Sequence, residues 1–381
     1  MYRYTGRQIV VGLTNICRFD RSIVWEDLEM LDLVFSAEPG GSHTSEDSKA
    51  FSDSKTQLLP LPKIAVSGCL VGQKVRYNGA AKTNQWVADQ LSQHTQISTF
   101  CPEMAMGLGA PRESMRLIRN GDGGISLIGN ESSTDYTELA LEKISHLVKS
   151  FPKDMDAFVL TSKSPTCGPE MVKVYDANGI PSSDGEGLFA AALRVAFPRA
   201  IVIDSGRLHD RDQRMLFLMR LYTLRRFKSF SDSVSGLQNF HQRHKFLLSG
   251  FNNKLFRELG RIAASTFESF EHQSECYHDK LLELLSSTLN RGAVSDSLMH
   301  LYSFLKRDLG EVQKKSILEL IDQFRLGHVG INTPLSILWY SNKLVGSNYM
   351  NGQFLFYPFP FELTQDVSNR KMSVVNERSR A

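Results

Sequence analysis

The sequence predicts a Rossmann-like α/β domain with a parallel sheet, followed by an all-α helical domain. Apolar, β-branched runs alternate with helix-like segments up to about residue 205, and strand-like runs cease after residue 207. Alternation of this kind is typical of a doubly wound parallel sheet. The strand-like runs lie at 63–67, 96–100, 157–161 and 200–205. We therefore divide the chain into a leader with a Ser-rich linker (1–57), an α/β domain (58–206) and a helical domain (207–381).

The leader carries little that a core would bury. Residues 36–57 are rich in Ser, Gly, Asp and Lys, so we expect a poorly ordered segment. No apolar run reaches the roughly 18–20 residues that a membrane span needs. Five cysteines in 381 residues do not make a disulfide scaffold. We expect a reducing compartment, and hence a cytoplasmic protein without a membrane partner.

Between the strands of the α/β domain, apolar spacing predicts three helices, at 84–92, 135–151 and 188–196. Two apolar runs joined by Asn120-Gly121 predict a hairpin over 115–128.

Helical spacing continues through the second domain. It predicts helices at 215–230, 237–248, 255–265, 277–289, 297–324 and 335–344. The aromatic run at 354–361 is expected to cover the helical core as a buried tail rather than to stack on bases.

Three of the strand-like runs are followed within six residues by a cysteine, namely Cys69, Cys101 and Cys167. Ligands of open parallel sheets bind at the carboxyl ends of the strands, so the three thiols are expected to converge at one edge. Three thiolates that hold an iron–sulfur cluster leave one iron open to substrate. The residues alone leave three alternatives: buried structural cysteines, a zinc site or a lone cysteine nucleophile. The sequence lacks the tight C-x-x-C spacing that is typical of a zinc finger or of many iron–sulfur clusters.

The segments around these cysteines resemble the signature blocks of the thiouracil desulfidase family, in order, over about residues 61–205. The resembling segments are 67–72 with 75–79, 101–103 with 107–112, and 163–168. The resemblance implies a 4Fe–4S cluster on Cys69, Cys101 and Cys167, and removal of sulfur from a thiolated pyrimidine. Residues 240–248, 256–261 and 357–363 resemble a domain of unknown function found behind this module, in proteins associated with removing sulfur from 4-thiouridine in tRNA.

Hydrolytic removal of sulfur requires a base for water and groups that stabilise developing charge. Glu103, two residues from a cysteine, is the candidate base, and its alternative is a solvated loop carboxylate. Lys163 and Ser164 are candidates to orient the base or stabilise the anion, or simply to structure their loop. The candidates for contacts with a nucleobase or phosphate are Arg76, Tyr77, Asn78 and Arg112. The alternative for these residues is that they only cap their loops.

The helical domain begins with a basic stretch. Residues 206–261 hold twelve Lys or Arg against four Asp or Glu, although the whole chain has a net charge of only +3. Such an excess favours phosphate contacts, and its alternative is a solvated helix face. The predicted RNA contacts are Arg225, Arg226, Arg243, His244 and Lys245.

Taken together, the sequence predicts an iron–sulfur enzyme that removes sulfur from thiolated uracil, with 4-thiouridine in tRNA as the preferred substrate. The first alternative is a desulfidase for free thiouracil. The second is a non-catalytic RNA-binding or redox-sensing protein whose cluster is regulatory.

Overall fold

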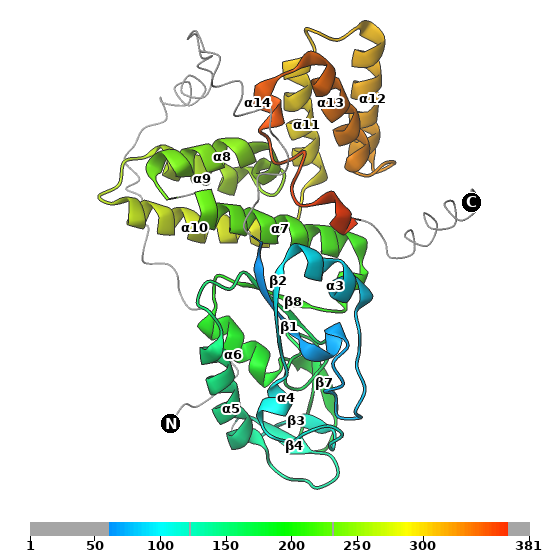
Figure 1. Ribbon diagram of the computed structural model, residues 1–381, viewed down its shortest axis with the longest axis vertical. Helices are drawn as coiled ribbons and strands as arrows, with labels where there is room; N and C mark the ends of the chain where they lie inside the picture. The colour runs from blue at the N-terminus through cyan, green and yellow to red at the C-terminus, as the bar shows by residue number, and fades with distance from the viewer. Residues whose placement is uncertain (1–60, 122, 231, 365–381) are drawn as a thin grey trace, which may run out of the picture.

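The computed structural model describes residues 61–121, 123–230 and 232–364, so the expected leader lies outside the described residues. The predicted fold class is confirmed: two small sheets with helices make up the first part, and only helices follow (Figure 1). Within the described residues, no helix is long and apolar enough to cross a membrane.

The first sheet is entirely parallel and has the strand order β2-β1-β5-β8. Its strands are β1 (Lys63–Ser67), β2 (Gln96–Phe100), β5 (Ala157–Leu160) and β8 (Ile201–Asp204). All four were predicted as strands. Every residue of β5 is buried, as expected for a strand covered on both faces. The parallel register brings the carboxyl ends of β2, β1 and β5 to one edge.

A second sheet has the order β4-β3-β6-β7. Its strands are β3 (Met115–Arg119), β4 (Ile125–Gly129), β6 (Val172–Tyr175) and β7 (Pro181–Gly185). The antiparallel hairpin β3–β4 was predicted, whereas β6 and β7 were not. β7 reads Pro-Ser-Ser-Asp-Gly and is largely exposed, so it carries none of the apolar alternation that marks a strand.

Three helices of the α/β part were predicted, and a fourth, at residues 102–105, was not. They are α3 (Gln85–Asp89), α4 (Pro102–Ala105), α5 (Thr137–Ser150) and α6 (Leu188–Ala196), with short 3-10 turns at Gly68–Val71 and Leu91–His94. The Asn84 side chain caps α3 by accepting from the backbone N–H of Val87.

The helical part contains α7 (Arg211–Phe230), α8 (Val234–Ser249), α9 (Asn253–Ala264), α10 (Phe270–Ser286), α11 (Arg291–Leu305), α12 (Glu311–Leu326), α13 (Asn332–Val345) and α14 (Asn348–Asn351). The single helix expected over 297–324 is wrong, because the chain turns between α11 and α12. Gly310 begins the new helix, and its backbone N–H donates to Gln313 Oε1 at 2.9 Å.

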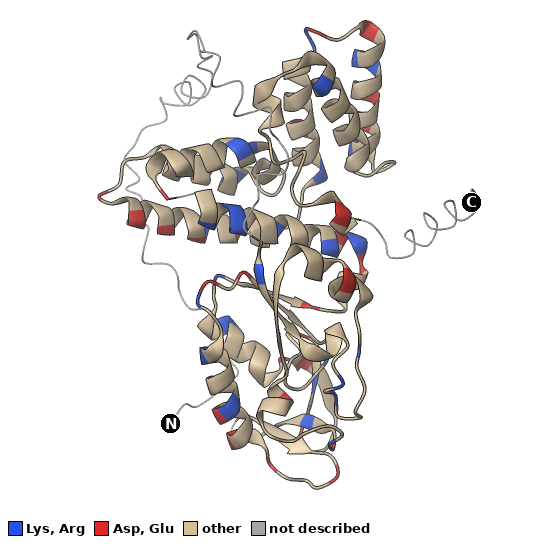
Figure 2. Ribbon diagram, viewed as in Figure 1, with Lys and Arg blue, Asp and Glu red and all other residues tan. Residues whose placement is uncertain are grey.

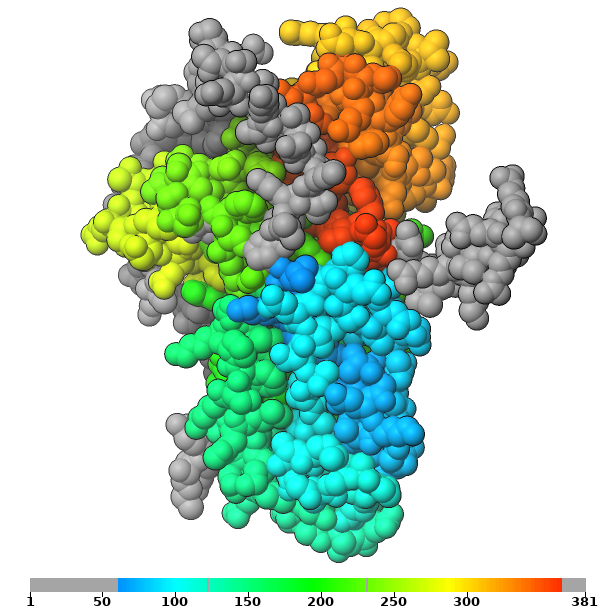
Figure 3. Space-filling view, viewed as in Figure 1, coloured from blue at the N-terminus to red at the C-terminus, as the bar shows by residue number. Residues whose placement is uncertain are grey.

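One apolar core crosses the expected boundary at residue 206. Ile64 and Val66 of β1 and Val159 of β5 belong to the same buried cluster as the apolar residues of α7 and α8. In Figure 1, α7 lies between the first sheet and the remaining helices, and the two parts are in direct contact in Figure 3. A second cluster, on the other side of the sheet, packs α5 and α6 against both sheets.

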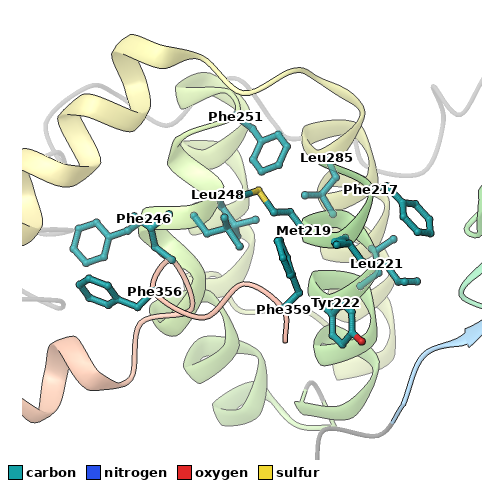
Figure 4. Packing of buried hydrophobic residues seen from close by; sticks show 14 of the residues in the cluster. Phe217, Met219, Leu221, Tyr222, Phe246, Leu248, Phe251, Leu285, Phe356 and Phe359 are labelled. Atoms are coloured by element: carbon teal, nitrogen blue, oxygen red, sulfur yellow. The ribbon is translucent and has the colours of Figure 1, made fainter. Parts of the chain in front are cut away.

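The aromatic run near the end of the described chain covers the helical core, as expected. Phe356 and Phe359 are buried, and they pack in a cluster with Phe246, Leu248 and Tyr222 (Figure 4). The chain then reaches the α/β part, where Trp86 Nε1 donates to the carbonyl of Leu363 at 3.2 Å.

A buried carboxylate joins the two parts. Asp156, just before β5, is 1% exposed and pairs with Lys228 Nζ at 2.7 Å and Arg225 Nη1 at 3.6 Å, both from α7. Its second oxygen accepts from the backbone N–H of Lys63 at 2.8 Å.

We expect Asp156→Asn to lower the free energy of unfolding by about 3 kcal/mol, because breaking a buried ion pair leaves its cations without compensation. Urea unfolding of the two variants measures this. The matched control is Asp154→Asn, whose half-exposed carboxylate pairs with Lys63 and whose loss should cost under about 1 kcal/mol. Equal effects of the two substitutions would contradict this account of how the parts are joined.

Candidate active site

The three cysteines line one cavity of about 190 Å³ at the carboxyl ends of β1, β2 and β5. Of the predicted site residues, the same cavity is lined by Cys69, Cys101, Cys167, Glu103, Lys163, Ser164, Arg76, Tyr77 and Arg112. The topological expectation that these distant segments meet at one edge is therefore met.

Cys69 lies in the short turn that follows β1, and it is 6% exposed. Its Sγ lies 3.0 Å from Thr161 Oγ1, at the end of β5. A Cβ added at the preceding Gly68 would meet the end of the exposed Gln73 side chain, and it would lie 3.4 Å from the carbonyl oxygen of Phe100, an ordinary contact. Only the flexible Gln73 side chain would have to move.

Cys101 stands at the N-cap of α4, directly after β2, with its Sγ 3.8 Å from the carbonyl oxygen of Val75. Burial raises the pKa of the Cys101 thiol. Burial disfavours the charged thiolate at this position, and the surrounding protein groups do not compensate for that cost.

Cys167 is positioned by its own loop. Ser164 Oγ accepts from the backbone N–H of Cys167 at 3.1 Å and of Thr166 at 3.3 Å. Gly168 is enclosed, because a Cβ there would lie 2.5 Å from Val172 Cγ2. Burial raises the pKa of Cys167, and the nearby negative charges of Glu103 and of ionised Cys101 raise it further. The site therefore disfavours free thiolates, whereas a bound cationic centre would favour them.

Glu103 forms an ion pair with Arg112 in the cavity wall, in which the Arg112 Nε lies 3.0 Å from Oε2. Its Oε1 accepts from Thr166 Oγ1 at 2.9 Å, so the carboxylate is tied to the loop of Cys167. Arg112 also donates to the carbonyl oxygen of Val75 at 3.0 Å. The pair thus connects the segments that carry all three cysteines.

The other predicted residues divide by position. Lys163 is exposed on the rim with a left-handed backbone, φ +59°. The Arg76 guanidinium lies 5.6 Å from the ring centroid of Tyr77, and both residues line the cavity. Asn78 does not line it: its Oδ1 accepts from the backbone N–H of Ala80 at 3.2 Å, so its role in the structure is that of a turn residue.

Lys82 is a cavity residue that sequence reasoning missed. Its Nζ donates to Ser162 Oγ at 2.7 Å, and its backbone N–H donates to the carbonyl of Cys69 at 2.9 Å. The loop from 72 to 82 folds back over Cys69 through the turn at Asn78-Gly79, and that turn was the only sequence signal of the return.

The donor set of the cavity consists of thiols, the usual ligands of an iron–sulfur cluster. Within the described ranges, no three side chains of His, Cys, Asp or Glu come close enough to share one metal ion. The cavity nevertheless presents three thiols and no imidazole. Soft thiolates spread around one cavity suit an iron–sulfur core, whose metals bind separate cysteines.

Comparison with known proteins identifies a family for the part of the chain that contains the three cysteines. Residues 64–205 match the family model described as 2-thiouracil desulfurase. A solved structure of a [4Fe-4S]-dependent thiouracil desulfidase, TudS, is 31% identical, and the match covers 39% of this chain and 94% of that one, with a TM-score of 0.31. Residues 64–205 belong to the 2-thiouracil desulfurase family.

Behind this desulfurase domain, residues 245–360 match the model of a protein of unknown function, DUF1722. The uncharacterized protein YbgA of Escherichia coli (strain K12) is 22% identical over 151 residues, which are 39% of this chain and 89% of the relative. The fusion that the sequence predicted, a desulfurase domain followed by this helical domain, is thereby confirmed.

The predicted RNA contacts behind the desulfurase domain require correction. Arg226 is 2% exposed, and it donates to the carbonyls of Pro358 at 2.8 Å and Tyr357 at 3.0 Å. His244 is fully buried between the rings of Phe240 and Phe354. Burial lowers the pKa of His244 well below its usual value, so the imidazole is neutral at pH 7. Neither side chain is placed to reach a phosphate.

The remaining members of that set face the protein as well. Arg225 pairs with Asp156, the Arg243 guanidinium lies 4.5 Å from the ring centroid of Phe354, and Lys245 Nζ lies 4.9 Å from that of Phe246. Figure 2 shows basic and acidic residues interspersed over the helical part of the view. The five predicted contacts are therefore engaged within the protein, whereas Arg211, Lys254 and Arg261 of the same basic stretch are exposed.

Proposed function

We propose that this protein is an iron–sulfur desulfidase that removes sulfur from thiolated uracil, with 4-thiouridine in tRNA as its substrate. The observation that carries the proposal is one cavity lined by three cysteines from three strand ends, together with a carboxylate. The related solved protein is itself described as a [4Fe-4S]-dependent thiouracil desulfidase.

Cys69, Cys101 and Cys167 would hold a 4Fe–4S cluster. With three protein ligands, the bound cluster would supply an open Lewis-acid position for the soft thiocarbonyl sulfur. The enclosed backbone at Gly168 keeps the segment of Cys167 closely packed beside the cavity.

The side chains around the thiols suit a hydrolysis. Glu103 would accept a proton from the water that attacks the thiocarbonyl carbon, and Arg112 would keep its carboxylate directed into the cavity. Lys163 and Ser164 lie on the loop that carries Cys167, and from this loop they would donate to the pyrimidine as negative charge develops. Arg76 and Tyr77 would hold the base at the mouth. Water replaces sulfur, which leaves as hydrogen sulfide, so no external electrons are needed.

The experiment is an anaerobic assay of purified protein whose iron and sulfide contents are measured first. The substrates are tRNA containing 4-thiouridine and free thiouracil. We expect loss of thiouridine absorbance with one sulfide released per base, and a higher kcat/KM for the RNA. Turnover of free thiouracil alone would contradict the tRNA assignment. An intact cluster without turnover of either substrate would contradict the enzyme and favour a sensor.

A further inference from the structure

A second cavity, of about 260 Å³, adjoins the candidate active site. The two cavities share Met115, Lys163 and Pro165 as lining residues. The remaining lining residues come mostly from the second sheet, and the proposed reaction uses none of them: Arg116, Asn130, Met171, Val172, Lys173, Tyr175 and Ser183.

The register of β3 against β6 places two cations side by side on this sheet. Leu117 pairs with Val174, and both side chains are buried in the core. The residue before each, Arg116 and Lys173, therefore lies on the opposite face, and Lys173 is exposed there. These two positions are neighbours across the strands.

The cation on β3 is held in place. An Nη1 of Arg116 donates to Asn130 Oδ1 at 3.0 Å, and the guanidinium lies 6.0 Å from the ring centroid of Tyr175. Asn130 is in turn fixed, because its Nδ2 donates to Ser114 Oγ at 2.7 Å. An oriented guanidinium beside an aromatic ring offers one group for a phosphate and another for a base.

Among the residues that the structure describes, Arg116, Lys163 and Lys173 line this cavity and no carboxylate does. Carboxylates on the flanking segments are engaged with other arginines: Asp184 with Arg119, Glu170 with Arg207 and Glu186 with Arg194. The cavity therefore presents positive charge together with an apolar surface, which includes Met171, 60% exposed. A nucleotide has the complementary chemistry, an anion joined to a flat ring.

We propose that this cavity binds the RNA nucleotide adjoining the thiouridine, with its phosphate on Arg116 and Lys173 and its base against Tyr175 and Met171. The inference rests on the proposed function, because it needs the thiouridine in the neighbouring cavity. Lys163, on the rim common to both cavities, lies between the two nucleotides. The proposed RNA contacts therefore lie on the second sheet instead of the helical part.

The test compares the double variant Arg116→Gln/Lys173→Gln with a matched variant that neutralises two exposed cations of α12, Lys315→Gln/Arg325→Gln. The probe is a fluorescent single-stranded RNA that carries one 4-thiouridine, added anaerobically to the full-length, cluster-loaded protein. Binding is measured from low to moderate salt, and turnover of this RNA is divided by turnover of free thiouracil.

For the second-sheet variant we expect a Kd about tenfold higher and a salt slope lower by about 0.7, since the variant loses one phosphate contact and each such contact on a single strand contributes about 0.7. The ratio of RNA turnover to thiouracil turnover should fall about tenfold. The α12 variant should match the wild type in all three measurements.

Unchanged RNA binding in the second-sheet variant would overturn the inference, as would a loss confined to the α12 variant. These outcomes are distinct from failure of the proposed function. If the wild-type protein desulfurises neither substrate, the proposed reaction is wrong, and the binding comparison still decides for or against the second cavity.

Discussion

Cys101→Ala is expected to remove the bound iron and to lower sulfide release at least a hundredfold. Cys101 is one of three thiols around the cavity, and no fourth cysteine within residues 61–364, as far as they are described, lines it. Losing a ligand should exceed the roughly 10–100-fold effect of losing a group that only supports a ligand. Iron and sulfide content, followed by turnover of thiolated tRNA and of free thiouracil, measure the effect.

The control for this variant is Ser98→Ala, an exposed position three residues earlier in the same strand, which should keep both iron and activity. Cys101→Ser adds a graded case, because a hydroxyl is a poorer ligand for iron than a thiolate. Full iron and full activity in Cys101→Ala would show that this thiol holds no cluster. Loss of both in Ser98→Ala would show that the strand, rather than the thiol, is the sensitive element.

Glu103→Gln is expected to lower kcat by about 10²–10⁴, the usual contribution of a positioned general base, while the bound iron remains. The amide has the shape of the carboxylate, and its oxygen can still accept from Thr166 Oγ1, but it cannot take a proton from water. Arg112 keeps its bonds to the carbonyls of Val75 and Gly109, so the wall of the cavity should stay in place. Steady-state kinetics with iron quantification of the same samples measure the change.

Glu113→Gln is the matched control. Its carboxylate lies outside the cavity, where it accepts from Ser132 and Tyr136, and the hydrogen bonds of Ser132 lower its pKa to about 2. We expect kcat within about twofold of the wild type. Unchanged kcat in Glu103→Gln would remove it as the base. A parallel loss of iron and activity would instead assign it a structural role.

The architecture that positions the site was predictable because the two central strands of its sheet, β1 and β5, are largely buried. A buried strand is an unbroken apolar run, so β1 and β5 stand out in the sequence. Parallel pairing then carries Cys69, Cys101 and Cys167 to one edge without any knowledge of side-chain contacts. The resemblance to the desulfidase family added the cluster and the chemistry, which spacing alone left open.

The prediction of RNA contacts failed because a count of charges carries no information on burial. Leu218, Tyr222 and Arg226 recur every four residues along α7, and all three are buried on one helix face. Phe240, His244 and Leu248 repeat the same spacing on α8. Their place in an apolar stripe was the available signal. On the second sheet, Arg116 and Lys173 were not among the predicted contacts. β7 lacks an apolar pattern, so this sheet was not recognised beyond its β3–β4 hairpin.

The most direct test of the central claim is Mössbauer spectroscopy of protein loaded anaerobically with ⁵⁷Fe, before and after addition of a thiolated uracil. Three cysteines around one cavity predict about four irons per chain, with one iron distinct from the other three and altered by the substrate. Four equivalent irons that do not respond to substrate would contradict the account, as would a single bound zinc ion in place of iron.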